Sequence, residues 1–125
     1  MDHISSLLTC IRNGQGVKLL NVKYNKIKLC TQILDVLIRK GFIRGYKVNN
    51  NTIEILLKYF KGFGVIKNIQ RVSKPGNKVY ISSFNLWKMQ NLQNKILILS
   101  TNHGILTHNE ALEKRIGGEV ILKID

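Results

Sequence analysis

Apolar residues recur at helical spacing in two segments of the first half of the chain, residues 3–13 and 26–40. Side chains three and four positions apart share one face of a helix, so each segment is typical of an amphipathic helix. We expect Gly14 to end the first helix, Asn25 to cap the second and Gly41 to end it. The apolar positions are Ile4, Leu7, Leu8 and Ile11 in the first segment and Ile27, Cys30, Ile33, Leu34, Leu37 and Ile38 in the second.

Strand patterns lie between and after these helices. Residues 17–24 could form a strand, and residues 42–48 and 52–60 are typical of a hairpin joined by the asparagines at 49–51. In the second strand of that hairpin, one alternating face is apolar and the other is mixed. Helix, strand, helix and hairpin together predict a compact α+β unit.

Two glycines within residues 61–64 interrupt the strand pattern and mark an expected boundary. We predict an α+β fold of two small packed subdomains, an N-terminal one of residues 1–63 and a C-terminal one of residues 64–125. The second is expected to be mainly antiparallel sheet with one short helix, and no long linker separates it from the first. Residues 65–83 are expected to form a hairpin that turns at Lys74-Pro75-Gly76, because proline followed by glycine suits a tight turn.

The last third of the chain carries shorter signals. Residues 84–94 suggest a short helix or a turn, and a strand at 96–99 leads into a polar loop at 100–104. A helix at 108–115 and a strand at 119–124 complete the expected order.

The helix at 108–115 has the clearest start signal. Thr107 can cap it, while Glu110 reaches back to complete a capping box. Gly117 fits the left-handed position that ends many helices. A polar loop held between a strand and a capped helix can present donors and acceptors to a partner with little loss of entropy. It could equally be an ordinary polar connection.

Charge indicates the class of partner. The chain has 20 Lys and Arg against 7 Asp and Glu, a net charge of +13 and a pI near 10.1. Such an excess on 125 residues favours a polyanion, with nucleic acid first and an anionic membrane surface second. The cations are spread from Arg12 to Lys123, and no apolar run is long enough to cross a membrane. We therefore expect nucleic acid and no membrane partner.

The cysteines and the codon bias of the chain bear on its compartment. Cys10 and Cys30 each fall on the apolar side of a predicted helix, which favours buried reduced thiols and a reducing compartment. The start, MDHISS, resembles neither a signal peptide nor an arginine-rich transit peptide. The chain is rich in Asn, Ile and Lys, the residues of AT-rich codons. We expect a protein that is encoded and used inside an organelle.

Catalytic and metal-binding patterns find little support in this sequence. The acids are scattered and form no convincing acid–base pair. His103 and His108 do not share a helical face and have no third ligand nearby, and Ser100 lacks a nucleophile elbow. We expect no enzyme, metal, cofactor or small-molecule substrate. Glu119 is the exception among the acids, because after two glycines it could accept hydrogen bonds from RNA or fix its own turn.

Two stretches carry a specific resemblance to a known family. The string S-T-x-x-G-I-L-T from Ser100, with the alanine-bearing helix, G-G-E and the last apolar strand, resembles small-subunit ribosomal protein eight of the bacterial and organellar type. The segment IQRVSKPGNKVY at 69–80 is similar to a hairpin of the same family. I-R-N at 11–13 and the strings KGFI and LLKYF between 40 and 60 are weaker matches. The chain departs from the family's glycine-rich turn within 84–94, and His103 replaces a usual lysine, serine or glutamine.

The resemblance implies a structural constituent of the small ribosomal subunit. It would bind the central domain of the small-subunit rRNA and contact neighbouring small-subunit proteins. The implied place is a ribosome in the mitochondrial matrix, with the bacterial cytoplasm or chloroplast stroma as alternatives. The alternative function is a free RNA-binding repressor that acts on messenger RNA through the same surface.

Candidate RNA-binding residues come from the chemistry and the resemblance together. Basic and aromatic residues around a turn can contact phosphates and sugars, and a helix N-terminus beside a lysine suits a phosphate. The simpler alternatives are that Tyr80 belongs to the sheet core, that Asn25 only caps its helix and that Arg12 is a solvated cation. The candidates are Ser100, Thr101, Asn102, His103, Gly104, Gly118, Glu119, Arg71, Ser73, Lys74, Lys78, Tyr80, Asn25, Lys26, Arg12 and Asn13.

Overall fold

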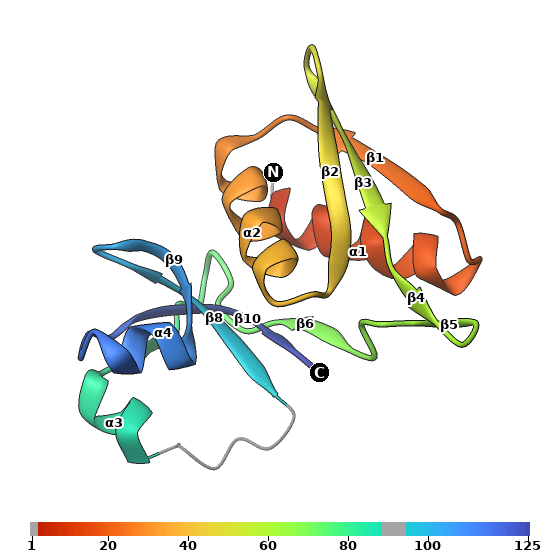
Figure 1. The fold of residues 1–125 in the computed structure, drawn as a ribbon. Helices are drawn as coiled ribbons and strands as arrows, with labels where there is room; N and C mark the ends of the chain where they lie inside the picture. Colours follow the sequence, from red (N-terminus) through yellow and green to blue (C-terminus); the bar gives the residue numbers. More distant parts are fainter. Residues whose placement is uncertain (1–2, 89–94) are drawn as a thin grey trace. The chain divides into compact units, whose positions relative to one another are not determined.

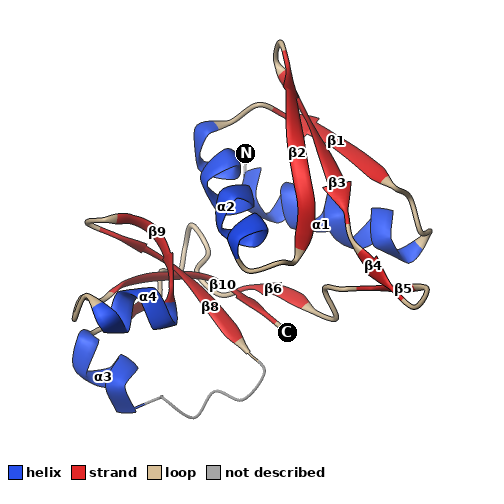
Figure 2. Cartoon of the chain, viewed as in Figure 1, coloured by secondary structure: helices blue, strands red, loops and turns tan. Residues whose placement is uncertain are grey.

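The computed structural model describes residues 3–88 and 95–125 (Figure 1). The chain divides into two compact units, Met1–Lys67 and Asn68–Asp125, each with helices and antiparallel strands. Figure 2 shows which segments of the chain are helix and which are strand. The predicted α+β class, with an antiparallel sheet in the C-terminal half, is confirmed. Among the described residues, no helix has the length and apolar character needed to cross a bilayer.

Two helices and a sheet form the N-terminal unit. The strands lie in the order β1, β3, β2, and α1 packs on β1 and β3 while α2 packs on β2 (Figure 1). The expected alternation in β3 is present, with Ile53, Ile55 and Leu57 buried. The bounds are α1 His3–Gly16, β1 Asn21–Asn25, α2 Lys28–Arg39, β2 Ile43–Asn49 and β3 Thr52–Leu57.

The sequence predicted that Gly14 would end the first helix, and this prediction is wrong. The helix α1 continues to Gly16, and a Cβ on Gly14 would lie only 2.3 Å from Cγ1 of Val22. The glycine therefore allows α1 to approach β1 closely. The first strand begins at Asn21 rather than at residue 17, because Lys18 takes a left-handed φ of 58° after the helix.

Asn25 does not cap the second helix. It is the last residue of β1, opposite Thr52, and the N-cap position belongs to Ile27, which makes no side-chain capping bond. Gly41 does follow the helix in a left-handed conformation, with φ of 79°. The helix is also tied to β2, where the hydroxyl of Tyr46 donates to Oδ1 of Asp35 over 2.8 Å. This hydrogen bond to the Asp35 carboxylate, together with burial and the Asp35 charge, raises the pKa of Tyr46.

The glycines at 62 and 64 lie in a small hairpin. Its strands are β4 Tyr59–Phe60 and β5 Phe63–Gly64, and the turn residues Lys61 and Gly62 have φ of 53° and 82°. Left-handed residues at both central positions are typical of a type I′ turn. The segment at residues 61–64, which was expected to mark the boundary between the subdomains, is therefore part of this ordered hairpin.

The C-terminal unit is a sheet with two short helices. The strands lie in the order β6, β10, β8, β9 (Figure 1). Strand β7 pairs with β10 beyond the end of β6. A core cluster lies between the sheet and the helices and contains Leu86, Leu97, Leu99, Ala111 and Val120. The bounds are β6 Ile69–Arg71, β7 Tyr80–Ile81, α3 Ser83–Lys88, β8 Ile96–Thr101, β9 Gly104–Thr107, α4 His108–Glu113 and β10 Gly118–Ile124.

The predicted hairpin at 65–83 is wrong in its pairing. β6 and β7 do not pair with each other, because both pair with β10. The strand β9 was not predicted at all. The predicted capping box of Thr107 and Glu110 is confirmed, but Arg115, with φ of 57°, takes the left-handed position expected of Gly117. Part of the expected helix or turn at 84–94 is α3, and residues 89–94 lie outside the described residues.

Both cysteines are free thiols, as expected. Cys30 is fully buried in α2, and Cys10 is half-buried in α1, with its thiol 3.4 Å from the carbonyl oxygen of Lys23. Burial raises the pKa of both thiols, so they are protonated and unreactive at neutral pH.

Candidate nucleic-acid interface

Tyr80, Ser100 and Glu119 meet at one end of the C-terminal sheet. Glu119 of β10 lies directly opposite Ser100 of β8 and directly opposite Tyr80 of β7. Opposite residues of an antiparallel pair project from the same face, so the three side chains form one row. Val120, the next residue, belongs to the core beneath the helices. The Tyr80–Glu119–Ser100 row therefore lies on the face of the sheet away from α3 and α4.

The row is accessible and polar. Tyr80 is 67% exposed, so the alternative that it belongs to the sheet core is wrong. Ser100 and Glu119 are half-buried. No hydrogen bond or ion pair within residues 3–88 and 95–125 engages the Glu119 carboxylate. The row thus presents a phenol, a carboxylate and a hydroxyl whose hydrogen-bonding capacity is open to a partner.

The double glycine lets three strands approach closely beside this row. A Cβ on Gly117 would lie 2.2 Å from the carbonyl oxygen of Ile81, and one on Gly118 would lie 2.3 Å from the carbonyl oxygen of Ser100. Both distances are far below van der Waals contact with backbone atoms. The glycines are therefore required for the packing of β10 between β7 and β8, which holds Glu119 between its two neighbours.

The predicted polar loop at 100–104 is a tight hairpin. Ser100 and Thr101 end β8, Gly104 begins β9, and only Asn102 and His103 form the turn. The Thr101 hydroxyl donates to the Gly104 carbonyl over 2.8 Å and accepts from the His103 amide over 3.1 Å. Gly104 has φ of 96°, which an L side chain would resist. Thr101 and Gly104 shape the hairpin, whereas Asn102 and His103 are exposed at its tip.

The connection between β6 and β7 supplies cations near the same strands. Lys74 and Asn77 exchange backbone hydrogen bonds of 3.1 and 3.0 Å around the Pro75-Gly76 turn, and Lys74 and Lys78 are exposed. Arg71 is half-buried, and its Nε donates to the Ser73 carbonyl. These cations are carried by a hydrogen-bonded turn rather than by an open loop.

Ser73 differs from the other candidates because its side chain is buried, at 1% exposure. Its hydroxyl donates to the Val79 carbonyl over 3.2 Å and accepts from the Val79 amide over 2.8 Å. The hydroxyl therefore closes the connection between β6 and β7 and cannot also reach an external partner. Ser73 therefore has a structural place in the connection that also carries Lys74 and Lys78.

The candidates of the N-terminal unit do not come together. The hydroxyl of Tyr24 lies 3.2 Å from Nδ1 of His3, at the start of α1, so Asn25 and Lys26 follow near that end. Arg12 and Asn13 lie three to four residues before the end of the same helix, Gly16. All four are exposed. They mark two separate places on the unit rather than one site.

Sequence reasoning missed one member of the site. Ile105 of β9 lies opposite Ser100, on the same face, and is half-buried. It extends the row by one strand and gives its polar residues an apolar edge. The glycine at 104 followed by two apolar residues was the available signal, because a glycine next to an apolar run is typical of a hairpin.

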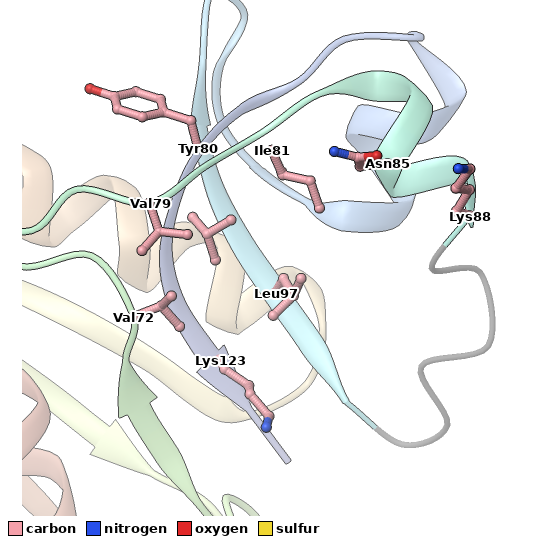
Figure 3. Close-up of a pocket in the computed structure, with 9 residues that line it drawn as sticks. Val72, Val79, Tyr80, Ile81, Asn85, Lys88, Leu97 and Lys123 are labelled. Atoms are coloured by element: carbon pink, nitrogen blue, oxygen red, sulfur yellow. The ribbon is translucent and has the colours of Figure 1, made fainter.

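A pocket of about 570 Å³ opens on the helix side of the same strands. Figure 3 shows Val79, Ile81 and Leu97 beside this pocket, with the ring of Tyr80 directed away from them. Tyr80 belongs to the lining of the pocket as well as to the Tyr80–Glu119–Ser100 row, whereas Glu119 and Ser100 do not line the pocket.

The histidines have no metal-binding arrangement in the described ranges 3–88 and 95–125, where no group of three or more His, Cys, Asp or Glu could hold a metal ion. His108 is buried, and its Nδ1 accepts the backbone N–H of Leu97 over 3.1 Å. This hydrogen bond joins α4 to β8.

Comparison with known proteins identifies the family of this chain. The family model for ribosomal protein S8 matches residues 2–124. The chain belongs to this family. Among its relatives, small ribosomal subunit protein uS8 of Rhizorhabdus wittichii is 42% identical, and its namesakes from Brucella anthropi and Zymomonas mobilis are 43% and 41% identical. Each comparison covers 98% of this chain and 96% of the relative. The resemblance found in the two motif stretches therefore extends over nearly the whole chain.

Proposed function

We propose that this chain is a non-enzymatic structural component of the small ribosomal subunit that binds the central domain of the small-subunit rRNA. The observation that carries the proposal is the register of β7, β10 and β8, which places Tyr80, Glu119 and Ser100 in one row. The net charge of +13 and family membership support a ribosomal RNA partner. Neighbouring small-subunit proteins are the further partners that we propose.

Folded RNA is recognised through its shape, its 2′-hydroxyls and its displaced bases. The Glu119 carboxylate can accept from a 2′-hydroxyl or a base amino group, and Ser100 can both donate and accept. Lys74 and Lys78 supply phosphate contacts. A carboxylate near phosphates is repelled unless it finds a donor, so Glu119 contributes discrimination rather than general affinity. Shape-selective binding by this surface follows.

The proposal is tested with Ser100→Ala and a purified central-domain rRNA fragment. We expect the affinity to fall by about 1 to 3 kcal/mol, because a hydrogen bond at the interface is lost and its RNA partner is left unpaired. Thr101 is left unchanged, since its hydroxyl holds the hairpin. Filter binding measures the affinity, and Thr9→Ala on the exposed side of α1 is the control. Equal affinities of Ser100→Ala and the parent chain would reject the surface.

Co-sedimentation separates the ribosomal role from the alternative of a free repressor of messenger RNA. A structural component is expected in the small-subunit fraction of a cell extract. A free pool bound to a messenger would instead favour the repressor. The relatives named above are bacterial, whereas the Asn-, Ile- and Lys-rich composition favours an organelle, which we propose to be the mitochondrion. Fractionation of the source cells tests the compartment.

A further inference from the structure

The β4–β5 hairpin exposes two aromatic rings where a sheet surface is usually polar. Phe60 and Phe63 lie opposite each other and are 68% and 76% exposed. The other pair of the hairpin, Tyr59 and Gly64, alternates to the opposite face. Large exposed apolar side chains that cluster in this way mark interaction sites more often than isolated ones do.

The hairpin is held in place from its inner face. The Tyr59 hydroxyl donates to the Leu19 carbonyl over 2.6 Å, and Nε2 of Gln15 donates to the Ile66 carbonyl over 2.9 Å. The side chain of Gln15 lies against Gly64, where a Cβ would come within 2.7 Å of it. Phe60 and Phe63 are therefore presented by a fixed backbone, which lowers the entropy cost of binding.

Cations surround the two rings. A pocket of about 590 Å³ borders them, and among the described residues its lining includes Lys58, Lys61 and Lys67 and no acid. The Lys61 ammonium lies 5.4 Å from the centre of the Phe60 ring. Lys58 donates to the Gly41 carbonyl over 3.1 Å, which fixes its ammonium at the base of the hairpin. The volume lies within the range of small-molecule binding sites.

We propose that Phe60 and Phe63 form a second RNA contact, which binds unpaired bases of single-stranded RNA. Each base would stack on an aromatic ring, and Lys61 and Lys67 would neutralise the adjoining phosphates. Exposed aromatics within a cationic groove are the features that bind single strands without sequence preference. A protein partner fits less well, because lysine is depleted at the centre of protein interfaces. This site lies in the N-terminal unit and does not depend on the Tyr80–Glu119–Ser100 row.

The test compares single-stranded and duplex RNA. The full chain and Phe60→Leu/Phe63→Leu are titrated with a short oligouridine and with a blunt RNA duplex of matching phosphate number. We expect about tenfold weaker binding of oligouridine by the variant, because leucine has no π face, and unchanged binding of the duplex. Phe60→Tyr/Phe63→Tyr should retain the parent affinity. Circular dichroism and thermal unfolding check that each variant is folded.

A matched control comes from a second exposed aromatic pair. Phe84 and Trp87 are 60% and 59% exposed, but their rings stack on each other with centres 6.4 Å apart, so each ring is already engaged by the other. Phe84→Leu/Trp87→Leu should therefore leave oligouridine binding unchanged. An equal loss in the two leucine pairs, an equal loss for single strand and duplex, or no loss at all would overturn the proposal. None of these results bears on binding of the central-domain fragment through the row.

Discussion

At the residue scale, the candidate interface depends on glycines as well as on polar side chains. Gly118 has no side chain because the Ser100 carbonyl oxygen occupies the place of a Cβ, at 2.3 Å. We expect Gly118→Ala to lower the free energy of unfolding by about 1 to 3 kcal/mol, because a backbone strand must shift to admit the methyl group. Urea unfolding measures the change.

The matched control for this prediction is Gly76→Ala in the same unit, where a Cβ would meet nothing within 4 Å. Gly118→Ala should also weaken binding of the central-domain fragment, since the displaced strand carries Glu119 away from Ser100. If Gly118→Ala and Gly76→Ala were equally stable, the close approach of β10 to β8 would not exist as described.

Single residues also show what the sequence could predict and what it could not. The sequence predicted that Glu119, which follows two glycines, could accept hydrogen bonds from RNA or fix its own turn, and this stays a prediction. The burial of Ser73 could not be predicted from the sequence. The backbone N–H groups of Val72 and Ser73 donate to the carbonyls of Ile121 and Val120 in β10. This pairing holds Ser73 where its hydroxyl bonds Val79. A contact with a strand some fifty residues away leaves no local trace in the sequence.

At the element scale, the best test is the start of α4. The Glu110 amide donates to the Thr107 hydroxyl over 3.3 Å, and the Thr107 amide donates to Oε1 of Glu110 over 3.0 Å. Thr107→Val keeps the shape of the side chain and removes the acceptor. We expect a loss of about 1 kcal/mol in the free energy of unfolding, measured with urea, and faster amide exchange in the first turn of α4.

Glu110→Gln is the companion variant, because glutamine can complete the same capping box. Its free energy of unfolding should stay within about 0.5 kcal/mol of the parent. A loss in Glu110→Gln as large as that in Thr107→Val would mean that the charge of Glu110, rather than the box, stabilises the helix.

Some local signals predicted their elements correctly, whereas the expected pairing of strands was wrong. The capping box of α4 and the alternation in β3 follow from neighbours in sequence, and both were predicted. The hairpin of β6 and β7 was wrong because proline and glycine predict a turn but not the partner of the strands that flank it. β10 pairs with both strands, and this choice is made by packing across the sheet.

At the scale of the whole molecule, charge and shape make separate contributions to RNA binding. The affinity should fall with salt along a logarithmic slope of about 0.7 to 0.9 per neutralised phosphate. Lys74 and Lys78 are exposed on the turn beside the row, so Lys74→Gln/Lys78→Gln should reduce the slope by about 1.5 for the central-domain fragment. Filter binding over a series of potassium chloride concentrations gives the slope.

The control for the salt slope is Lys23→Gln/Lys47→Gln, on exposed positions of β1 and β2. It removes the same number of positive charges from the N-terminal unit. If both pairs reduced the slope equally, only the net charge of +13 would matter for RNA binding. The position of Lys74 and Lys78 on the turn would then make no difference. If only the turn pair reduces it, the phosphates lie where the β6–β7 connection meets the RNA. The row of Tyr80, Glu119 and Ser100 then needs to discriminate only among RNAs already held there by charge.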